Sequence, residues 1–186
     1  MSGTGEMTRV PTAQDEARFW ALVDSGWERL GAEAAALRRA LIARDPEEDG
    51  DGDEYAVDAW LDPLLGHLRE LCVGLSAREL TDLDRVLERK LHDLDRADVH
   101  DVTDGSDDGF LYARGWIVAL GREYYEAVRA DPAMAVLDAD CEEMCYFFAH
   151  LHEERFGEWP ETGSGICRET GGNEAGWAEA DSAGEA

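Results

Sequence analysis

Positive charge is scarce in this chain. Its 186 residues contain 17 lysines and arginines against 43 aspartates and glutamates, and Lys90 is the single lysine. The formal net charge of −26 repels nucleic acid backbones and anionic lipid, so we expect no nucleic-acid binding through a basic patch. No glycine-rich loop precedes Lys90, which excludes a phosphate-binding loop of the Walker type.

Long hydrophobic runs are also missing. No segment reaches the roughly 18 to 20 consecutive apolar residues of a membrane-spanning helix. The polar start of the chain, Met1 to Glu6, lacks the basic and apolar regions of a signal peptide. The four cysteines, at positions 72, 141, 145 and 167, show no disulfide-framework spacing and fit reduced thiols. We therefore expect a cytoplasmic protein that makes no membrane contact.

The chain shows no segment in which apolar and polar residues alternate with period two, so strands are not expected. Apolar residues recur instead at helical spacing, and Thr12 with Asp15 and Ser76 with Glu79 form capping-box patterns. The sequence predicts an all-α fold: a single bundle-like domain of five or six helices. The six helices begin near residues 12, 32, 57, 76, 106 and 140.

Two acidic, apolar-poor stretches set the expected limits of the domain. Residues 45–54 contain seven acids and no base, and residues 157–186 contain seven acids against Arg168 alone. Like charges in glycine-rich surroundings cannot bury enough surface to offset the entropy of ordering. We predict a flexible N-terminus at 1–11, a helical domain at 12–160 with an acidic linker at 45–54, and a disordered acidic tail at 161–186.

The segment 106–130 is expected to form one long central helix. Ser106 is a good N-cap, and Asp107 and Asp108 place negative charge in the first turn, where the helix dipole favours it. At about 100° per residue, more than half of the helix circumference is apolar. Arg114 falls inside this apolar arc, so we expect a buried guanidinium.

An unpaired buried guanidinium would cost several kcal/mol, so a carboxylate is expected within hydrogen-bonding reach of Arg114. Asp107 lies two turns earlier on the same helix, and Asp84 flanks the apolar stripe of the preceding helix. One interpretation is a structural ion pair that fixes the register of two helices. The other is an anion-binding or catalytic arginine at the floor of a cleft. The candidate ligand-binding residues of that cleft are Ser106, Asp107, Asp108, Arg114 and Trp116.

The motif around Arg114 resembles a known family. Gly105-Ser106-Asp107-Asp108-Gly109-Phe110, followed by Arg114-Gly115-Trp116 and Gly121-Arg122-Glu123, is similar to the bacterial family named domain of unknown function 4240. The resemblance is looser at residues 19–23 and 75–94. It implies a small, mostly helical domain with no established activity, substrate or cofactor. In the family an aromatic-rich run with tryptophan precedes the Asp-Asp-Gly-Phe motif, whereas Asp95–Val102 stands there in this chain.

Metal-binding motifs fail when they are tested position by position. His152 begins a pattern of the zinc-protease type, but Phe156 stands where the second histidine is needed. Cys141, Cys145 and His152 share one helical stripe and are the remaining metal candidates. Cys145 and His152 lie about 10 Å apart along the helix axis, which is too far for one ion without ligands from another segment. We expect no metal and no cofactor.

Two functional hypotheses remain open. The first is a non-catalytic protein-interaction or regulatory module, which the missing catalytic constellation and the acidic tail favour; its protein partner is unknown. The second is an enzyme or small-ligand binder with a pocket at the start of the central helix, between Ser106 and Arg114. The accessibility of Arg114 distinguishes them.

Overall fold

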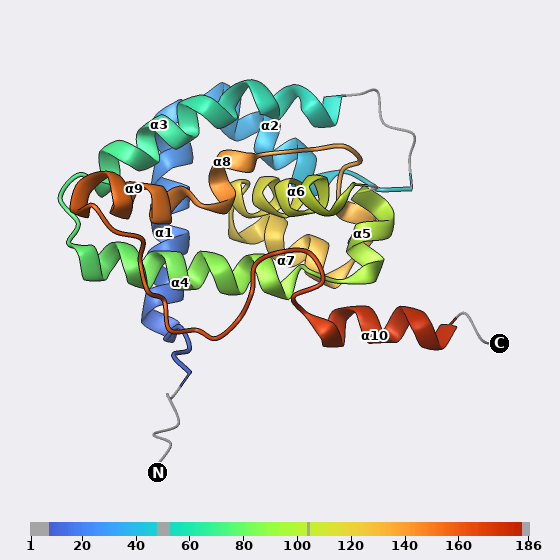
Figure 1. Ribbon diagram of the computed structural model, residues 1–186. Coiled ribbons are helices and arrows are strands. Elements are labelled where there is room, and N and C mark those ends of the chain that lie inside the picture. Colours follow the sequence, from blue (N-terminus) through green and yellow to red (C-terminus); the bar gives the residue numbers. More distant parts are fainter. Residues whose placement is uncertain (1–7, 48–52, 104, 184–186) are drawn as a thin grey trace, which may run out of the picture.

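The computed structural model describes residues 8–47, 53–103 and 105–183, with side chains as far as residue 178. This part of the chain is all-helical (Figure 1) and contains no strand. It has ten α-helices and two short 3-10 helices, where five or six helices were predicted. In chain order these are α1 (Ala13–Leu30), α2 (Ala32–Ala43), η1 (Asp53–Trp60), α3 (Leu61–Cys72), α4 (Ala77–Asp93), α5 (Ala97–Thr103), α6 (Asp107–Ala119), α7 (Arg122–Ala130), η2 (Pro132–Met134), α8 (Glu142–Cys145), α9 (Phe147–Phe156) and α10 (Glu174–Ala183).

Both predicted capping boxes are formed at helix starts. The Thr12 hydroxyl accepts from the Asp15 amide at the start of α1, and the Asp15 carboxylate accepts from the Thr12 amide. Ser76 and Glu79 make the same reciprocal pair at the start of α4. Such caps depend on residues three positions apart, so the sequence alone locates them.

The predicted continuous helix over 106–130 is wrong, because the chain breaks at Gly121. Gly121 has φ +91°, a conformation that side chains with a Cβ rarely adopt, and it separates α6 from α7. The Arg38 guanidinium packs against this break and donates to the carbonyl of Leu120 (2.7 Å). An arginine from α2 thus satisfies a carbonyl that a continuous helix would have used itself.

Helix α6 is the central element of the fold. It packs against α4, α5, α7 and α8, and almost all of its side chains from Phe110 onward are buried. The indole of Trp27, on α1, donates to the carbonyl of Ala119 (2.8 Å) and ties the end of α6 to the first helix. Helix α1 in turn packs against α2, α3 and α4. None of the described helices is both long and apolar enough to cross a membrane.

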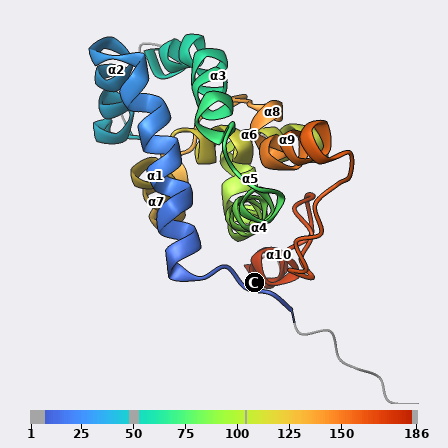
Figure 2. The same ribbon diagram turned by 90° about the vertical axis from the view of Figure 1, so that its left-hand side faces the viewer.

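The C-terminal segment packs against the helices, contrary to the prediction of a disordered tail from residue 161. It runs from the end of α9 across α4 to α10 (Figure 1), on the side of α4 that faces away from α1 (Figure 2). Ser164 and Arg168 are buried, and the amide of Arg9 donates to the carbonyl of Gly163 (2.8 Å). The prediction failed because it weighed the segment's own composition, whereas buried charges on α4 supply the partners.

Parts of the other predicted flexible regions lie outside the described residues. These are residues 1–7 of the N-terminus and 48–52 of the acidic linker, together with 184–186 of the tail. The linker's last two residues, Asp53 and Glu54, already belong to η1.

Candidate functional site

Arg114 is buried, as predicted, with 0% of its surface exposed. Its Nη1 donates to the carbonyls of Leu91 and Arg168, both at 2.9 Å. Its Nη2 donates to the Thr170 hydroxyl at 3.1 Å, and Nε approaches the carbonyl of Phe110 at 3.4 Å. The guanidinium carbon also lies 4.7 Å from the centre of the Phe110 ring. The C-terminal segment therefore seals Arg114 from solvent.

The predicted carboxylate partner of Arg114 is wrong: among the described side chains, neither Asp84 nor Asp107 nor any other acid forms an ion pair with it. Leu91 lies in the last turn of α4, where the unpaired carbonyls and the helix dipole favour a cation. Burial lowers the pKa of Arg114, and the nearby Asp95 carboxylate opposes that shift. Carbonyl dipoles and an aromatic face therefore replace the expected salt bridge.

Asp84 pairs with Arg168 instead. Arg168 donates to both oxygens of the Asp84 carboxylate, at 3.2 and 2.8 Å, and lies 3.5 Å from Glu88. Burial raises the pKa of the Asp84 carboxyl, and the adjacent Arg168 guanidinium opposes the shift. Sequence reasoning missed Arg168. The available signal was its position as the only base among residues 157–186, where an isolated cation stands among seven acids.

The five predicted ligand-binding residues do not converge on one cavity. Ser106 caps α6 by accepting from the amide of Gly109 (3.1 Å). Asp107 and Asp108 are exposed, and the Asp107 carbonyl accepts from the Thr170 hydroxyl. Arg114 and Trp116 are both completely buried, and the Trp116 indole donates to Asp58 (2.7 Å). Surface carboxylates and a sealed guanidinium cannot act together on one ligand.

A groove of about 780 Å³ lies elsewhere, between α2, η1 and residues 133–137. None of the predicted site residues lines it. Its walls combine apolar side chains with the Arg44 guanidinium and the carboxylates of Asp45, Asp53 and Glu54.

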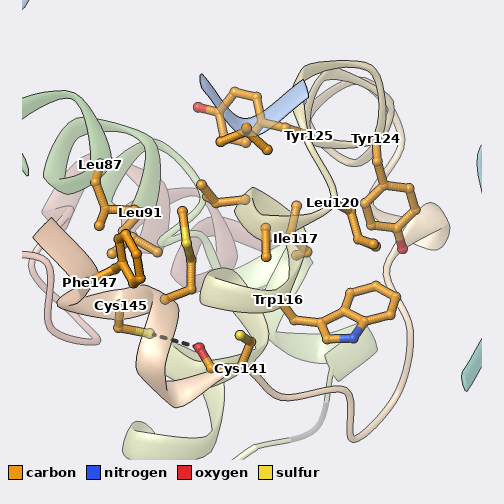
Figure 3. Packing of buried hydrophobic residues seen from close by; sticks show 14 of the residues in the cluster. Leu87, Leu91, Trp116, Ile117, Leu120, Tyr124, Tyr125, Cys141, Cys145 and Phe147 are labelled. Carbon is orange, nitrogen blue, oxygen red and sulfur yellow. Dashed lines mark hydrogen bonds between the residues drawn. The ribbon is translucent and has the colours of Figure 1, made fainter. Parts of the chain in front are cut away.

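The three metal candidates belong to the packed interior. Figure 3 shows Cys141 and Cys145 among core side chains, with the Cys145 thiol directed at the carbonyl of Cys141 (3.7 Å). Burial raises the pKa of each of these two thiols to about 12, which disfavours the thiolate that binds metals. The His152 ring lies 2.7 Å from the carbonyl of Glu158. The described residues contain no group of three or more histidine, cysteine or acidic side chains placed to hold a metal ion.

A strongly acidic surface forms where three segments meet, none of which contains a lysine or arginine: 53–66, 105–113 and 131–149. Two hydrogen bonds join these segments: from the Tyr55 hydroxyl to the Leu137 carbonyl (2.8 Å), and from the Cys141 amide to the Tyr112 carbonyl (3.0 Å). Trp116, just beyond the second segment, donates to Asp58. Burial raises the pKa of Asp58; the hydrogen bond from Trp116 opposes this shift, and the neighbouring Asp140 carboxylate adds to it. We call this surface the acidic face; its carboxylates are Glu54, Asp58, Asp62, Asp108, Asp138, Asp140, Glu142 and Glu143. The linear sequence did not reveal it.

Comparison with known proteins gives a family and no activity. Searches among curated proteins and among solved structures found no match. Residues 40–154 match the family model described as a protein of unknown function, DUF4240. The match includes the motif at 105–123 and ends before Arg168. It spans more than half of the chain, and the protein therefore belongs to the DUF4240 family.

Proposed function

We propose that this protein is a non-catalytic interaction module that binds a basic protein through its acidic face. One observation carries the proposal: Arg114, the buried charge of the motif at 105–123, is sealed inside the molecule and donates hydrogen bonds to Leu91, Arg168 and Thr170. Its role is to join α4, α6 and the C-terminal segment. The motif at 105–123 therefore stabilises the fold, and contacts with a partner are left to the exposed residues of the acidic face.

The competing hypothesis of a small-ligand pocket at the start of α6 gains no support from this geometry. Such a site needs polar groups that converge on one solvent-accessible point. Asp108 points to the surface, whereas the Arg114 guanidinium is covered by Thr170 and the Arg168 carbonyl. A substrate could reach Arg114 only if the C-terminal segment left its place.

The acidic face fits a partner rich in lysine and arginine. Carboxylates of one sign on adjoining segments create a potential that speeds encounter with an oppositely charged surface. Contacts between exposed charges are screened at about 10 Å in 0.1 M salt, so binding should weaken steeply as salt rises. The same potential repels nucleic acids and other acidic proteins.

The test compares two triple variants that each remove three negative charges. One neutralises the acidic face with Asp140→Asn, Glu142→Gln and Glu143→Gln. The other neutralises three exposed acids on α1, α2 and α7, at Glu28, Glu33 and Glu123. Wild type and both variants are immobilised and cross-linked at low salt to proteins from a lysate of the native host. The captured proteins are then identified by mass spectrometry. The strongest captured partner is then purified and titrated by calorimetry.

We expect a partner with an excess of basic residues that binds wild type and the control variant equally. The acidic-face variant should bind it about tenfold more weakly, because each lost rim contact contributes up to about 1 kcal/mol. Equal losses in both variants would show that only the total charge matters. A partner that is unaffected by salt and by the acidic-face variant would contradict the proposal.

A further inference from the structure

The Arg168 guanidinium occupies a socket formed entirely by side chains and backbone of the family-matched region. The carboxylates of Asp84 and Glu88 lie on one side, and the carbonyl of Cys145 accepts a further hydrogen bond at 2.8 Å. The ring of Tyr146 lies 4.8 Å from the guanidinium carbon. Two carboxylates, a carbonyl and an aromatic face match the planar, multidentate geometry of arginine, which lysine cannot reproduce.

Neighbouring residues of the same surface bind the backbone of the C-terminal segment. Arg85 donates to the carbonyl of Thr162 (2.5 Å), and Arg114 donates to the carbonyl of Arg168. At the far end, the Asp95 carboxylate accepts from the amides of Gly171 (3.1 Å) and Asn173 (2.8 Å). These contacts go to backbone groups, and the chain that they hold is irregular: Gly163, Gly165 and Gly171 have positive φ, and residues 169–172 form a turn.

Side chains of the segment other than Arg168 are also bound, among them the hydroxyls of Thr162, Ser164 and Thr170. The Thr170 hydroxyl, two residues after Arg168, accepts from Arg114 and donates to the carbonyl of Asp107. Four residues before Arg168, the Ser164 hydroxyl donates to Glu88. The arrangement therefore distinguishes an arginine followed by a hydroxyl residue at the second position after it.

The segment is held mainly by polar contacts. Pro160 is buried, but Ile166 and Trp177 are only half-buried, and Cys167 is exposed. In contrast, Asp84 on the receiving surface is almost completely buried, and its ion-pair partner comes from beyond residue 154. This burial includes the cover given by the C-terminal segment, and a buried carboxylate without a partner is costly, so an occupant that covers Asp84 must bring a cation to it.

We propose that the surface formed by α4, α6, α8 and the start of α9 is a binding site for a peptide segment with the pattern Arg-x-Thr or Arg-x-Ser. We call it the arginine groove; its recognition residues are Asp84, Arg85, Glu88, Asp95, Arg114 and Tyr146. Residues 160–173 occupy it in cis and compete with a peptide supplied by another protein. Both surfaces draw on α6 and α8, but none of the recognition residues of the groove is a carboxylate of the acidic face, so this inference does not depend on the proposed function.

The experiment uses the full chain and a fluorescent synthetic peptide of residues 160–178, with Cys167→Ser to prevent oxidation. Two hosts are titrated: wild type and the full-chain variant Arg168→Ala/Thr170→Ala, whose own segment lacks the Arg168 guanidinium and the Thr170 hydroxyl. A tethered segment competes at an effective concentration on the order of millimolar. We therefore expect the peptide to bind the variant at least about tenfold more tightly than wild type, and to raise the melting temperature of the variant.

Matched peptides test recognition. The peptide with Arg168→Lys keeps the positive charge but lacks the planar guanidinium, so it should bind about tenfold more weakly than the unchanged peptide. The peptide with Arg168→Ala should not bind detectably. The acidic-face triple change, added to the same host, should leave peptide affinity unchanged. If it abolishes binding, the peptide is attracted only by surface charge, which overturns the arginine groove and leaves the proposed function standing.

Hydrogen exchange of the wild-type full chain provides a second measurement that does not require the variant to fold. Excess peptide should displace the cis segment and speed amide exchange at Gly171 and Asn173, which lose their bonds to Asp95. The Arg168→Lys peptide should have a much smaller effect. Unchanged exchange at saturating peptide would overturn the inference.

Discussion

Replacement of Arg114 by methionine measures how much the buried guanidinium stabilises the fold. Methionine fills similar space but leaves the carbonyls of Leu91 and Arg168 and the hydroxyl of Thr170 without their donor. Hydrogen bonds from a charged donor contribute about 1.5 to 3 kcal/mol each. Removing the charge also recovers its desolvation cost of several kcal/mol. We expect a net loss of about 3 kcal/mol in the free energy of unfolding.

The assay is urea unfolding followed by tryptophan fluorescence, with calorimetric melting as a check. A loss of about 3 kcal/mol corresponds to a drop of about 6 to 12 °C in melting temperature for a domain of this size. Arg122→Met, at an exposed position at the start of α7, is the control and should change stability by less than about 0.5 kcal/mol. Arg114→Lys should fall between wild type and Arg114→Met, because one ammonium cannot span the same acceptors. If the free energy of unfolding of Arg114→Met is within about 1 kcal/mol of the wild-type value, the hydrogen bonds of Arg114 do not stabilise the fold to the expected extent.

Two further predictions concern a close helix contact and a pH-dependent cap. A Cβ at Gly115 would lie 2.5 Å from the carbonyl oxygen of Cys141, so Gly115→Ala should destabilise by about 1 to 3 kcal/mol in urea unfolding. A Cβ at Gly66, inside α3, would have no other residue within 4 Å, so Gly66→Ala should instead stabilise the protein by about 0.5 to 1 kcal/mol. If the two substitutions change the free energy of unfolding in the same direction, this packing argument is refuted. Hydrogen bonds from Ser76, followed by the bond from Arg18, lower the pKa of Glu79 from 4.5 to about 2, so its stabilisation is complete above pH 4.5 and is lost as pH falls through about 2. The melting-temperature gap between wild type and Glu79→Gln should therefore be widest near neutral pH and close at the acidic end, and a gap independent of pH would contradict the assignment.

Local sequence was sufficient where a feature depends on neighbours within one helix turn. The all-helical fold and both capping boxes follow from residues three or four positions apart. The burial of Arg114 follows from its phase on an apolar helix arc. Ser106 was placed correctly as the cap of α6 for the same reason.

Only the tertiary structure shows which distant residues these helices contact. Gly121 breaks the predicted long helix at the point where Arg38, from a helix far earlier in the chain, reaches the Leu120 carbonyl. Arg114 bonds to the carbonyl of Arg168, 54 residues away, and the Arg168 guanidinium bonds to Asp84, 84 residues away. Composition describes how a segment behaves in water, and it contains no information about the buried charges that the fold places opposite it. For that reason the acidic C-terminal segment reads as disordered in the sequence and is packed in the fold.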